Sequence, residues 1–130
     1  MSKTPRAALI LATLLAATLV VAAQTQTGAQ FYAEYRAASA KAKGFGDLAP
    51  MMSKAEREKL AAIPADQQKT LWDLSKQMDV RDLKIVKETP TANGATLEIT
   101  AIGQGNTKVK GIVKLVKEGG AWKWDGEEVM

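Results

Sequence analysis

Five aromatic side chains are the groups in this sequence best suited to line a binding site. They are Tyr32, Tyr35, Trp72, Trp122 and Trp124. Trp122 and Trp124 alternate with polar residues, which places both indoles on one face of a strand. Phenol and indole rings combine flat apolar surface with a polar edge, which suits a small apolar ligand. We expect a ligand pocket built from these five residues, and packing in the core is the alternative for the same side chains.

The two tyrosines could also transfer protons, with Asp73 or Asp79 as the base. No spacing in the sequence forces these groups together. The chain has no cysteine and no histidine, which excludes a thiolate nucleophile, a Ser-His-Asp triad, disulfides and the usual zinc or copper ligands. We therefore expect a non-catalytic domain with no cofactor and no metal site. An isomerase or hydrolase that uses Asp and Tyr is the alternative.

Three lysines, Lys108, Lys110 and Lys114, alternate with apolar residues and therefore share the outer face of a predicted strand. Such a stripe could bind phosphate, anionic lipid headgroups or an acidic polymer of the envelope. Polar residues of the preceding strand lie across from them: Thr96, Glu98 and Thr100. A solvated surface of charge pairs is the alternative. Nucleic acid is not an expected partner, because no aromatic residues interleave with the lysines.

The N-terminus has the pattern of a cleavable signal peptide. Lys3 and Arg6 precede an apolar run over residues 7–21, and Val-Ala-Ala at 21–23 supplies small residues before a cleavage site. A retained membrane anchor is the alternative, although the run is shorter than the roughly 20 residues that a span prefers. We expect export to the periplasm or the medium, with no membrane span after cleavage.

Composition divides the chain of 130 residues, with a net charge of +4, into four parts. Residues 1–23 are the signal peptide, and the Gln- and Thr-rich residues 24–30 are expected to form a flexible leader. Residues 31–126 hold enough apolar residues for one domain. The acidic C-terminal end, residues 127–130, is expected to be a frayed tail.

The spacing of apolar residues predicts a first helix over residues 31–44. Its apolar stripe consists of Phe31, Tyr35, Ala38, Ala42 and Phe45. Ser53 and Glu56 have the spacing of a capping box and predict a second helix over 54–62. A third helix follows Pro64 and ends near Met78.

After residue 79 the apolar period changes to two, which predicts four strands. The clearest strand places four apolar residues on one face: Ala95, Leu97, Ile99 and Ala101. Asn93-Gly94 predicts the first strand turn and Gly119-Gly120 the last. The expected fold class is α+β, with three N-terminal helices packed on a curved, cone-shaped, four-stranded antiparallel sheet.

The aromatic first helix, two short helices around a proline break and a meander ending in Lys-Glu-Gly-Gly-Ala-Trp-Lys (117–123) resemble the nuclear transport factor 2-like superfamily, a cystatin-like α+β cone. The similarity is greatest to small bacterial secreted lumazine-binding-like domains. This resemblance implies a curved sheet around a long helix with a pocket at its open end. Because the superfamily includes isomerases, dehydratases, epoxide hydrolases and non-catalytic binders, it does not choose a function.

The leading hypothesis is a secreted or periplasmic domain that binds a small apolar ligand or an envelope protein partner. A structural envelope protein that forms a homodimer through the outer sheet face is a further alternative. That face would then present four apolar residues: Val86, Ile102, Ile112 and Val116.

Overall fold

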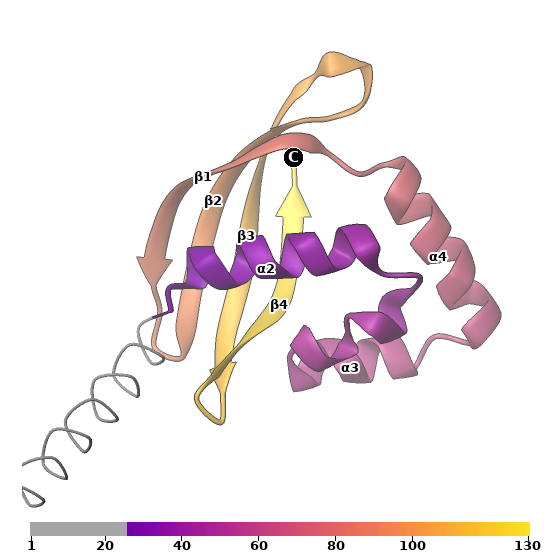
Figure 1. Cartoon of the computed structure of the whole chain (residues 1–130), viewed down its shortest axis with the longest axis horizontal. Coiled ribbons are helices and arrows are strands. Elements are labelled where there is room, and N and C mark those ends of the chain that lie inside the picture. Colours follow the sequence, from indigo (N-terminus) through magenta and orange to yellow (C-terminus); the bar gives the residue numbers. More distant parts are fainter. Residues whose placement is uncertain (1–25) are drawn as a thin grey trace, which may run out of the picture.

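The computed structural model describes residues 26–130. The expected signal peptide, residues 1–23, lies outside the described residues. The described chain forms three α-helices followed by a four-stranded antiparallel sheet (Figure 1). The expected α+β class is confirmed.

The first helix, α2 (Gly28–Lys41), begins inside the segment expected to be a flexible leader. Thr27 caps it, because its hydroxyl accepts from the Gln30 amide at 3.1 Å while the Gln30 side chain accepts from the Thr27 amide at 2.9 Å. This reciprocal capping box satisfies amides that a helix start otherwise leaves without partners. The Glu88 carboxylate accepts hydrogen bonds from two further backbone amides at this helix start, those of Gly28 and Ala29. The expectation of a leader through residue 30 was therefore wrong.

Helix α2 ends at Lys41, before the predicted end at Gly44. Phe45 lies in a short 3-10 turn, η1 (Phe45–Asp47). The Asp47 carboxylate accepts from the Lys43 amide at 2.8 Å, which fixes this turn. Phe45 is partly buried and packs against the core, edge-on to Trp72, with ring centroids 5.0 Å apart. A second short turn, η2 (Ala49–Met51), follows.

The second helix, α3 (Lys54–Ala61), begins at the predicted cap, Ser53. Only half of the predicted capping box forms. The Ser53 hydroxyl accepts from the Glu56 amide, but the Ser53 amide donates to the carbonyl of Trp124 at 2.9 Å rather than to the Glu56 side chain. The start of α3 is thereby attached to the last strand.

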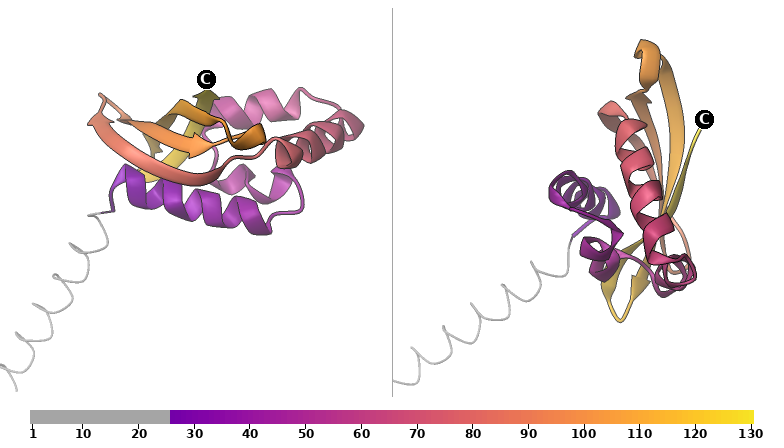
Figure 2. Two further views of the ribbon diagram at one scale, coloured as in Figure 1. Left: turned by 90° about the horizontal axis from the view of Figure 1, so that it is seen from above. Right: turned by 90° about the vertical axis from the view of Figure 1, so that its right-hand side faces the viewer.

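The third helix, α4 (Ala65–Gln77), follows Pro64 as predicted. In Figure 1, α3 lies beside β4, α4 lies farther out and leads into β1, and α2 lies across the sheet. The views in Figure 2 show that α2 covers one face of the sheet.

The sheet is a meander in the order β1-β2-β3-β4. Its strands are β1 (Arg81–Pro90), β2 (Gly94–Ile102), β3 (Lys108–Glu118) and β4 (Ala121–Val129). Gly119 and Gly120 form the predicted last turn with φ of 58° and 82°, the left-handed conformation that tight hairpins require. Strand β4 continues to Val129, so the expectation of a frayed tail over 127–130 was wrong.

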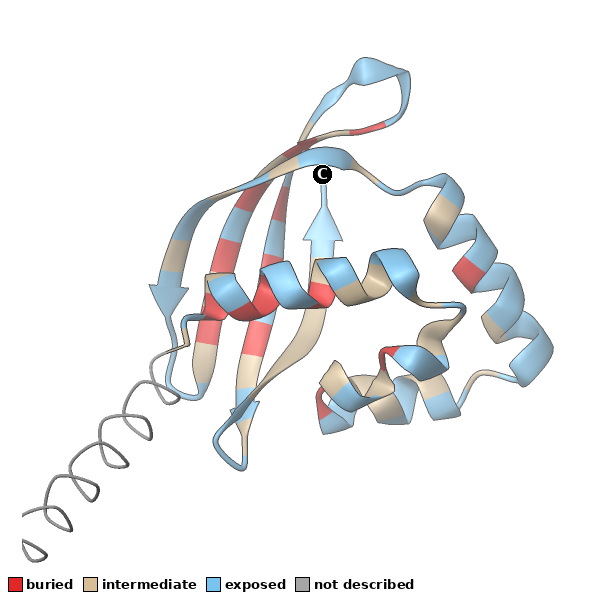
Figure 3. Ribbon diagram, in the orientation of Figure 1, coloured by how far each residue is buried: buried red, intermediate tan, exposed pale blue. Residues whose placement is uncertain are grey.

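The inner face of the sheet carries the core. Leu97 on β2 pairs with Val113 on β3, and both are fully buried. Figure 3 shows the buried positions of β2 and β3 beneath α2. The predicted alternation in β2 is confirmed, because its apolar residues are buried while Glu98 between them is exposed.

Strand β1 is irregular in two places. Its pairing with β2 shifts between Arg81 and Lys84 and again between Ile85 and Lys87. Asp82, in the first irregularity, has φ of 52°, which is uncommon for a residue other than glycine. Such bulges bend a strand and redirect its side chains.

Candidate functional site

Three of the five aromatic residues predicted to form a pocket border one cavity. Tyr35, Trp72 and Trp124 line a space of about 230 Å³ between α2, α4 and β4, which we call the aromatic cleft. Tyr32 and Trp122 do not line it. Tyr32 is fully buried on the face of α2 that packs on the sheet, and Trp122 lies at the start of β4.

The rings around the aromatic cleft pack on one another. The Tyr35 ring stacks on the Trp124 ring, with centroids 5.2 Å apart and an angle of 7° between the planes. The Tyr32 ring stacks on the Tyr35 ring in turn, with centroids 6.3 Å apart. Tyr35 and Trp72 are only 6% and 7% exposed. The Tyr35 and Trp72 rings contribute mainly to the core, because little of their surface is free to contact a ligand.

Trp122 fixes the entry of the chain into α2. Its indole N–H donates to the Gln26 carbonyl at 2.9 Å, and the Lys117 ammonium lies 4.8 Å from the ring centroid. The ring therefore joins the β3-β4 hairpin to the residues that precede α2.

The charged groups of the aromatic cleft are engaged with their neighbours. The Arg36 guanidinium donates to the Asp79 carboxylate at 3.0 Å. The Lys76 ammonium donates to the Ser39 carbonyl at 2.6 Å and lies 4.6 Å from the Trp72 centroid. A ligand in the cleft would have to displace these contacts.

Glu127, the remaining charged group of the aromatic cleft, is also engaged. Its carboxylate accepts from the Tyr32 hydroxyl at 3.2 Å and from the Trp124 indole N–H at 3.1 Å. The carboxylate therefore satisfies two polar groups of otherwise apolar side chains.

Both phenols are poor proton donors in this setting. Burial raises the pKa of Tyr32 and of Tyr35 far above the ordinary value, and the negative charge of Glu127 raises both further. Neither side chain readily forms the phenolate that a base requires. Asp73, a predicted partner, is exposed and pairs with Lys69 at 2.9 Å.

The Asp79 carboxylate has a permanent cation as its partner. Burial by itself would lower the pKa of Arg36, but the hydrogen bond and the charge of Asp79 outweigh it and the pKa is raised. The guanidinium therefore stays charged and holds the carboxylate. The structure does not leave Asp79 free as a base beside the tyrosines.

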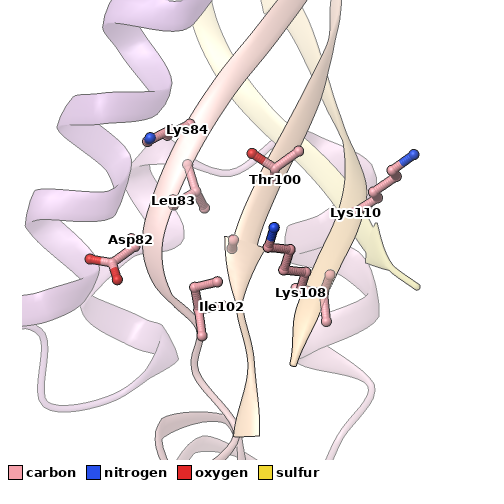
Figure 4. A pocket seen from close by; sticks show the side chains of 9 residues that line it. Asp82, Leu83, Lys84, Thr100, Ile102, Lys108 and Lys110 are labelled. Atoms are coloured by element: carbon pink, nitrogen blue, oxygen red, sulfur yellow. The ribbon is translucent and has the colours of Figure 1, made fainter. Parts of the chain in front are cut away.

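A larger cavity, of about 740 Å³, lies where β1, β2 and β3 meet next to the β2-β3 connection (Figure 4). We call it the sheet-end hollow. Its apolar lining residues are Leu83, Ala101, Ile102 and Val109. Its polar and charged lining residues are Asp82, Lys84, Thr100, Lys108 and Lys110.

Strand register explains how the lysines of the sheet-end hollow gather. Lys84 pairs with Thr100 and Thr100 pairs with Lys110, so these three residues form one row across three strands. The next row joins Arg81, Ile102 and Lys108 in the same way. The sequence indicated Lys108 and Lys110, but the bulges in β1 hid the position of Lys84.

The lysines of the sheet-end hollow differ from the charged groups of the aromatic cleft. Within residues 26–130, none of Lys84, Lys108 and Lys110 makes an ion pair within 4.0 Å. Asp82, the acid in the lining, lies 4.0 Å from Arg81 instead. These ammonium groups are therefore available to an added anion.

Over residues 26–130, the acidic side chains form no cluster that could hold a metal ion. None of the helices in the same residues has the length and apolar character needed to cross a bilayer.

Comparison with known proteins returns no matching family model and no matching curated protein. Among solved structures, the chain is similar to a SEC-C motif-containing protein from Rhodopseudomonas palustris. The TM-score is 0.49 and the identity 16%, over 82% of this chain and 83% of that chain. A likeness this distant carries neither ligand nor activity over to this chain.

The resemblance to the nuclear transport factor 2-like superfamily was wrong, because the comparison returns a SEC-C motif protein and nothing supports the earlier assignment. The hairpin motif that suggested it is a turn that any antiparallel pair of strands can use. The space between α2 and the sheet is filled by core residues such as Tyr32 and Leu97, both fully buried.

Proposed function

We propose that this chain is an exported, non-catalytic domain that binds a small ligand with apolar surface in the sheet-end hollow. The observation that carries the proposal is the cavity itself, about 740 Å³ with four apolar lining residues. Small-molecule sites typically enclose roughly 300–1,000 Å³ and are mostly apolar with a few polar groups.

The two cavities differ in what a ligand would have to break. Arg36, Lys76 and Glu127 at the aromatic cleft already hold protein partners. Displacing such contacts costs free energy because buried polar groups lose their hydrogen bonds. The sheet-end hollow imposes no comparable cost, since its lysines make no ion pair with any carboxylate of residues 26–130.

A non-catalytic role is favoured by the state of the candidate acid-base groups. The pKa of both Tyr32 and Tyr35 is raised by burial, and Asp79 is held by Arg36. Export is supported by the basic and apolar N-terminal pattern. Export is tested by expressing the whole chain in an exporting bacterium and measuring the mass of the purified protein. We expect the mass that corresponds to cleavage after Ala23.

Ligand binding is tested with phenylnaphthylamine, a neutral apolar dye that fluoresces more strongly when it leaves water. We expect the wild-type protein to enhance its fluorescence and the variant Ile102→Asn to lose that enhancement, because Ile102 lines the sheet-end hollow. Ile112→Asn is the matched control. Ile112 lies on the same sheet face, opposite Glu98, and does not line the hollow.

Equal dye binding by the two variants, or no binding by the wild type, would contradict the proposal. Native mass spectrometry of the protein extracted gently from its expression host adds a second readout. A retained small molecule that Ile102→Asn loses and Ile112→Asn keeps would identify the ligand.

A further inference from the structure

The outer sheet face is most strongly basic at the sheet-end hollow. Three of the nine residues that line the hollow are lysines, and the acid among them, Asp82, lies 4.0 Å from the Arg81 guanidinium. Arg81 offsets the charge of that carboxylate, so the positive charge of the lysines remains. Farther along the same face the signs alternate, because Lys87 pairs with Glu98 in the strand register. The excess positive charge therefore belongs to this end of the sheet.

Two neighbouring rows of the sheet carry these cations. The first row consists of Lys84, Thr100 and Lys110, and the second of Arg81, Ile102 and Lys108. Each row thus has a cation on β1, an uncharged side chain on β2 and a cation on β3. The flanking Cα atoms of a row lie two strand spacings apart, about 10 Å, and the rows follow one another after about 7 Å. The rows form a short track along β2 with cations on both sides.

The uncharged side chains on β2 form the floor of this track. Thr100 and Ile102 are half-buried, whereas the flanking lysines are exposed. Figure 4 shows Lys108 beside both floor residues, with Lys84 and Lys110 to either side. Lysine carries its charge on a flexible stem, so the three ammonium groups can turn toward an anion on the floor. The Thr100 hydroxyl can add a hydrogen bond to the same anion.

The length of the track favours a compact ligand with more than one negative group. A single phosphate or carboxylate reaches the cations of one row, because the next row lies about 7 Å away. A longer polymer does not fit as well. Glu98 is exposed at the next outward position of β2 and repels an anion that extends beyond Thr100. At the other end the strand stops at Ile102. Two or three closely spaced anionic groups therefore match the track.

We infer that the ligand of the sheet-end hollow is a compact multivalent anion, with two or three phosphate or carboxylate groups held over β2 by Lys84, Lys108 and Lys110. This inference rests on the proposed function, because it concerns the same hollow, and it adds the charge of the ligand. Ile102 is the contact that remains for an apolar part. Two cation rows that flank Thr100 and Ile102 are the juxtaposition that carries the inference.

Calorimetric titration at low ionic strength tests the inference with three probes: inorganic triphosphate, citrate and orthophosphate. Triphosphate should bind about tenfold more tightly than orthophosphate, because it reaches the cations of both rows at once. Citrate distinguishes the two sources of charge. Binding of triphosphate alone would support the inference for phosphates, and binding of citrate as well would support it for both groups. If neither bound more tightly than orthophosphate, the inference would be overturned.

The double variant Lys84→Gln/Lys110→Gln should bind triphosphate about tenfold less tightly than the wild type. Its control, Lys87→Gln/Lys114→Gln, removes the same charge from the same sheet face outside the hollow and should change the affinity less than about twofold. All four lysines are exposed, so both variants should keep the wild-type melting temperature. An equal loss of affinity in both would show general attraction to the sheet face and overturn the inference.

Phenylnaphthylamine separates a failure of this inference from a failure of the proposed function. The dye is neutral, so Lys84→Gln/Lys110→Gln should still enhance its fluorescence. Dye binding without binding of triphosphate or citrate would overturn the inference and leave the proposed function intact. Binding of triphosphate without binding of the dye would contradict the apolar part of the proposed function and support the multivalent anion.

Anionic vesicles form the last arm. Binding of triphosphate or citrate in solution without sedimentation on the vesicles is the expected result. Sedimentation that Lys84→Gln/Lys110→Gln abolishes, without binding of either probe in solution, would overturn the inference in favour of a membrane surface.

Discussion

The hydroxyl of Tyr32 on α2 donates to the carboxylate of Glu127 on β4 at 3.2 Å and so joins the first described helix to the last strand, 95 residues later. The same carboxylate accepts from the Trp124 indole at 3.1 Å. Glu127 therefore completes the core although its residue type suggests a solvated position. The C-terminal residues belong to the domain for this reason.

Glu127→Ala should lower the free energy of unfolding by about 2–3 kcal/mol, because it leaves two largely buried donors without an acceptor. Glu127→Gln retains an acceptor oxygen and should cost less than half as much. Urea unfolding measures both. Equal, small losses would show that the hydrogen bonds of Tyr32 and Trp124 contribute little.

Ser53→Ala should cost about 1–3 kcal/mol. The Ser53 side chain is 1% exposed, donates to Asp125 at 2.6 Å and accepts from the Glu56 amide. Glu56→Gln should cost only about 0.5 kcal/mol, because its side chain does not complete the capping box. Thermal unfolding of the two variants distinguishes them, and a larger loss in Glu56→Gln would contradict the assignment.

Gly94→Ala should destabilise the fold by about 3 kcal/mol. A Cβ at residue 94 would lie 2.1 Å from the Leu115 carbonyl oxygen, so β2 and β3 would have to separate. Gly44→Ala is the matched control. Nothing lies within 4 Å of a Cβ at Gly44, and its backbone is extended, so its stability should change by less than about 1 kcal/mol. Chemical denaturation of both proteins provides the comparison.

Stability should fall in alkaline solution. The pKa of Tyr32 and Tyr35 is raised by burial above the ordinary 10.0, so the folded state holds both phenolic protons more tightly than the unfolded state. This contribution is complete below pH 10 and is lost as the pH rises toward the folded-state pKa, by about 1.4 kcal/mol per tyrosine and pH unit. Urea unfolding at several pH values measures it, and Tyr35→Phe should weaken the dependence. An unchanged dependence would contradict the effect of burial.

Trp124→Ala should lower stability by about 3 kcal/mol without changing the affinity for phenylnaphthylamine. Trp124 stacks on Tyr35 and bonds Glu127 at the aromatic cleft, and it does not line the sheet-end hollow. Parallel dye titration and thermal unfolding separate the two effects. If the variant lost dye binding while remaining folded, the ligand site would be the aromatic cleft.

Local residue patterns were sufficient for much of the fold. Alternation in β2 predicted that Leu97 faces the core and Glu98 faces solvent, because successive side chains of a strand point to opposite faces. Ser53 and Pro64 located the starts of α3 and α4, since caps act on backbone amides within a few residues. The sequence by itself thus determined the elements and their buried faces.

Only the tertiary structure decided which polar groups meet. Glu127 lies under Tyr32 because of the register of β4, and Lys84 lies opposite Thr100 because β1 contains bulges. These contacts join residues far apart in the chain, and a shift of one residue in register would send each side chain to the other face. The location of the candidate site therefore depends on strand pairing, which no local pattern encodes.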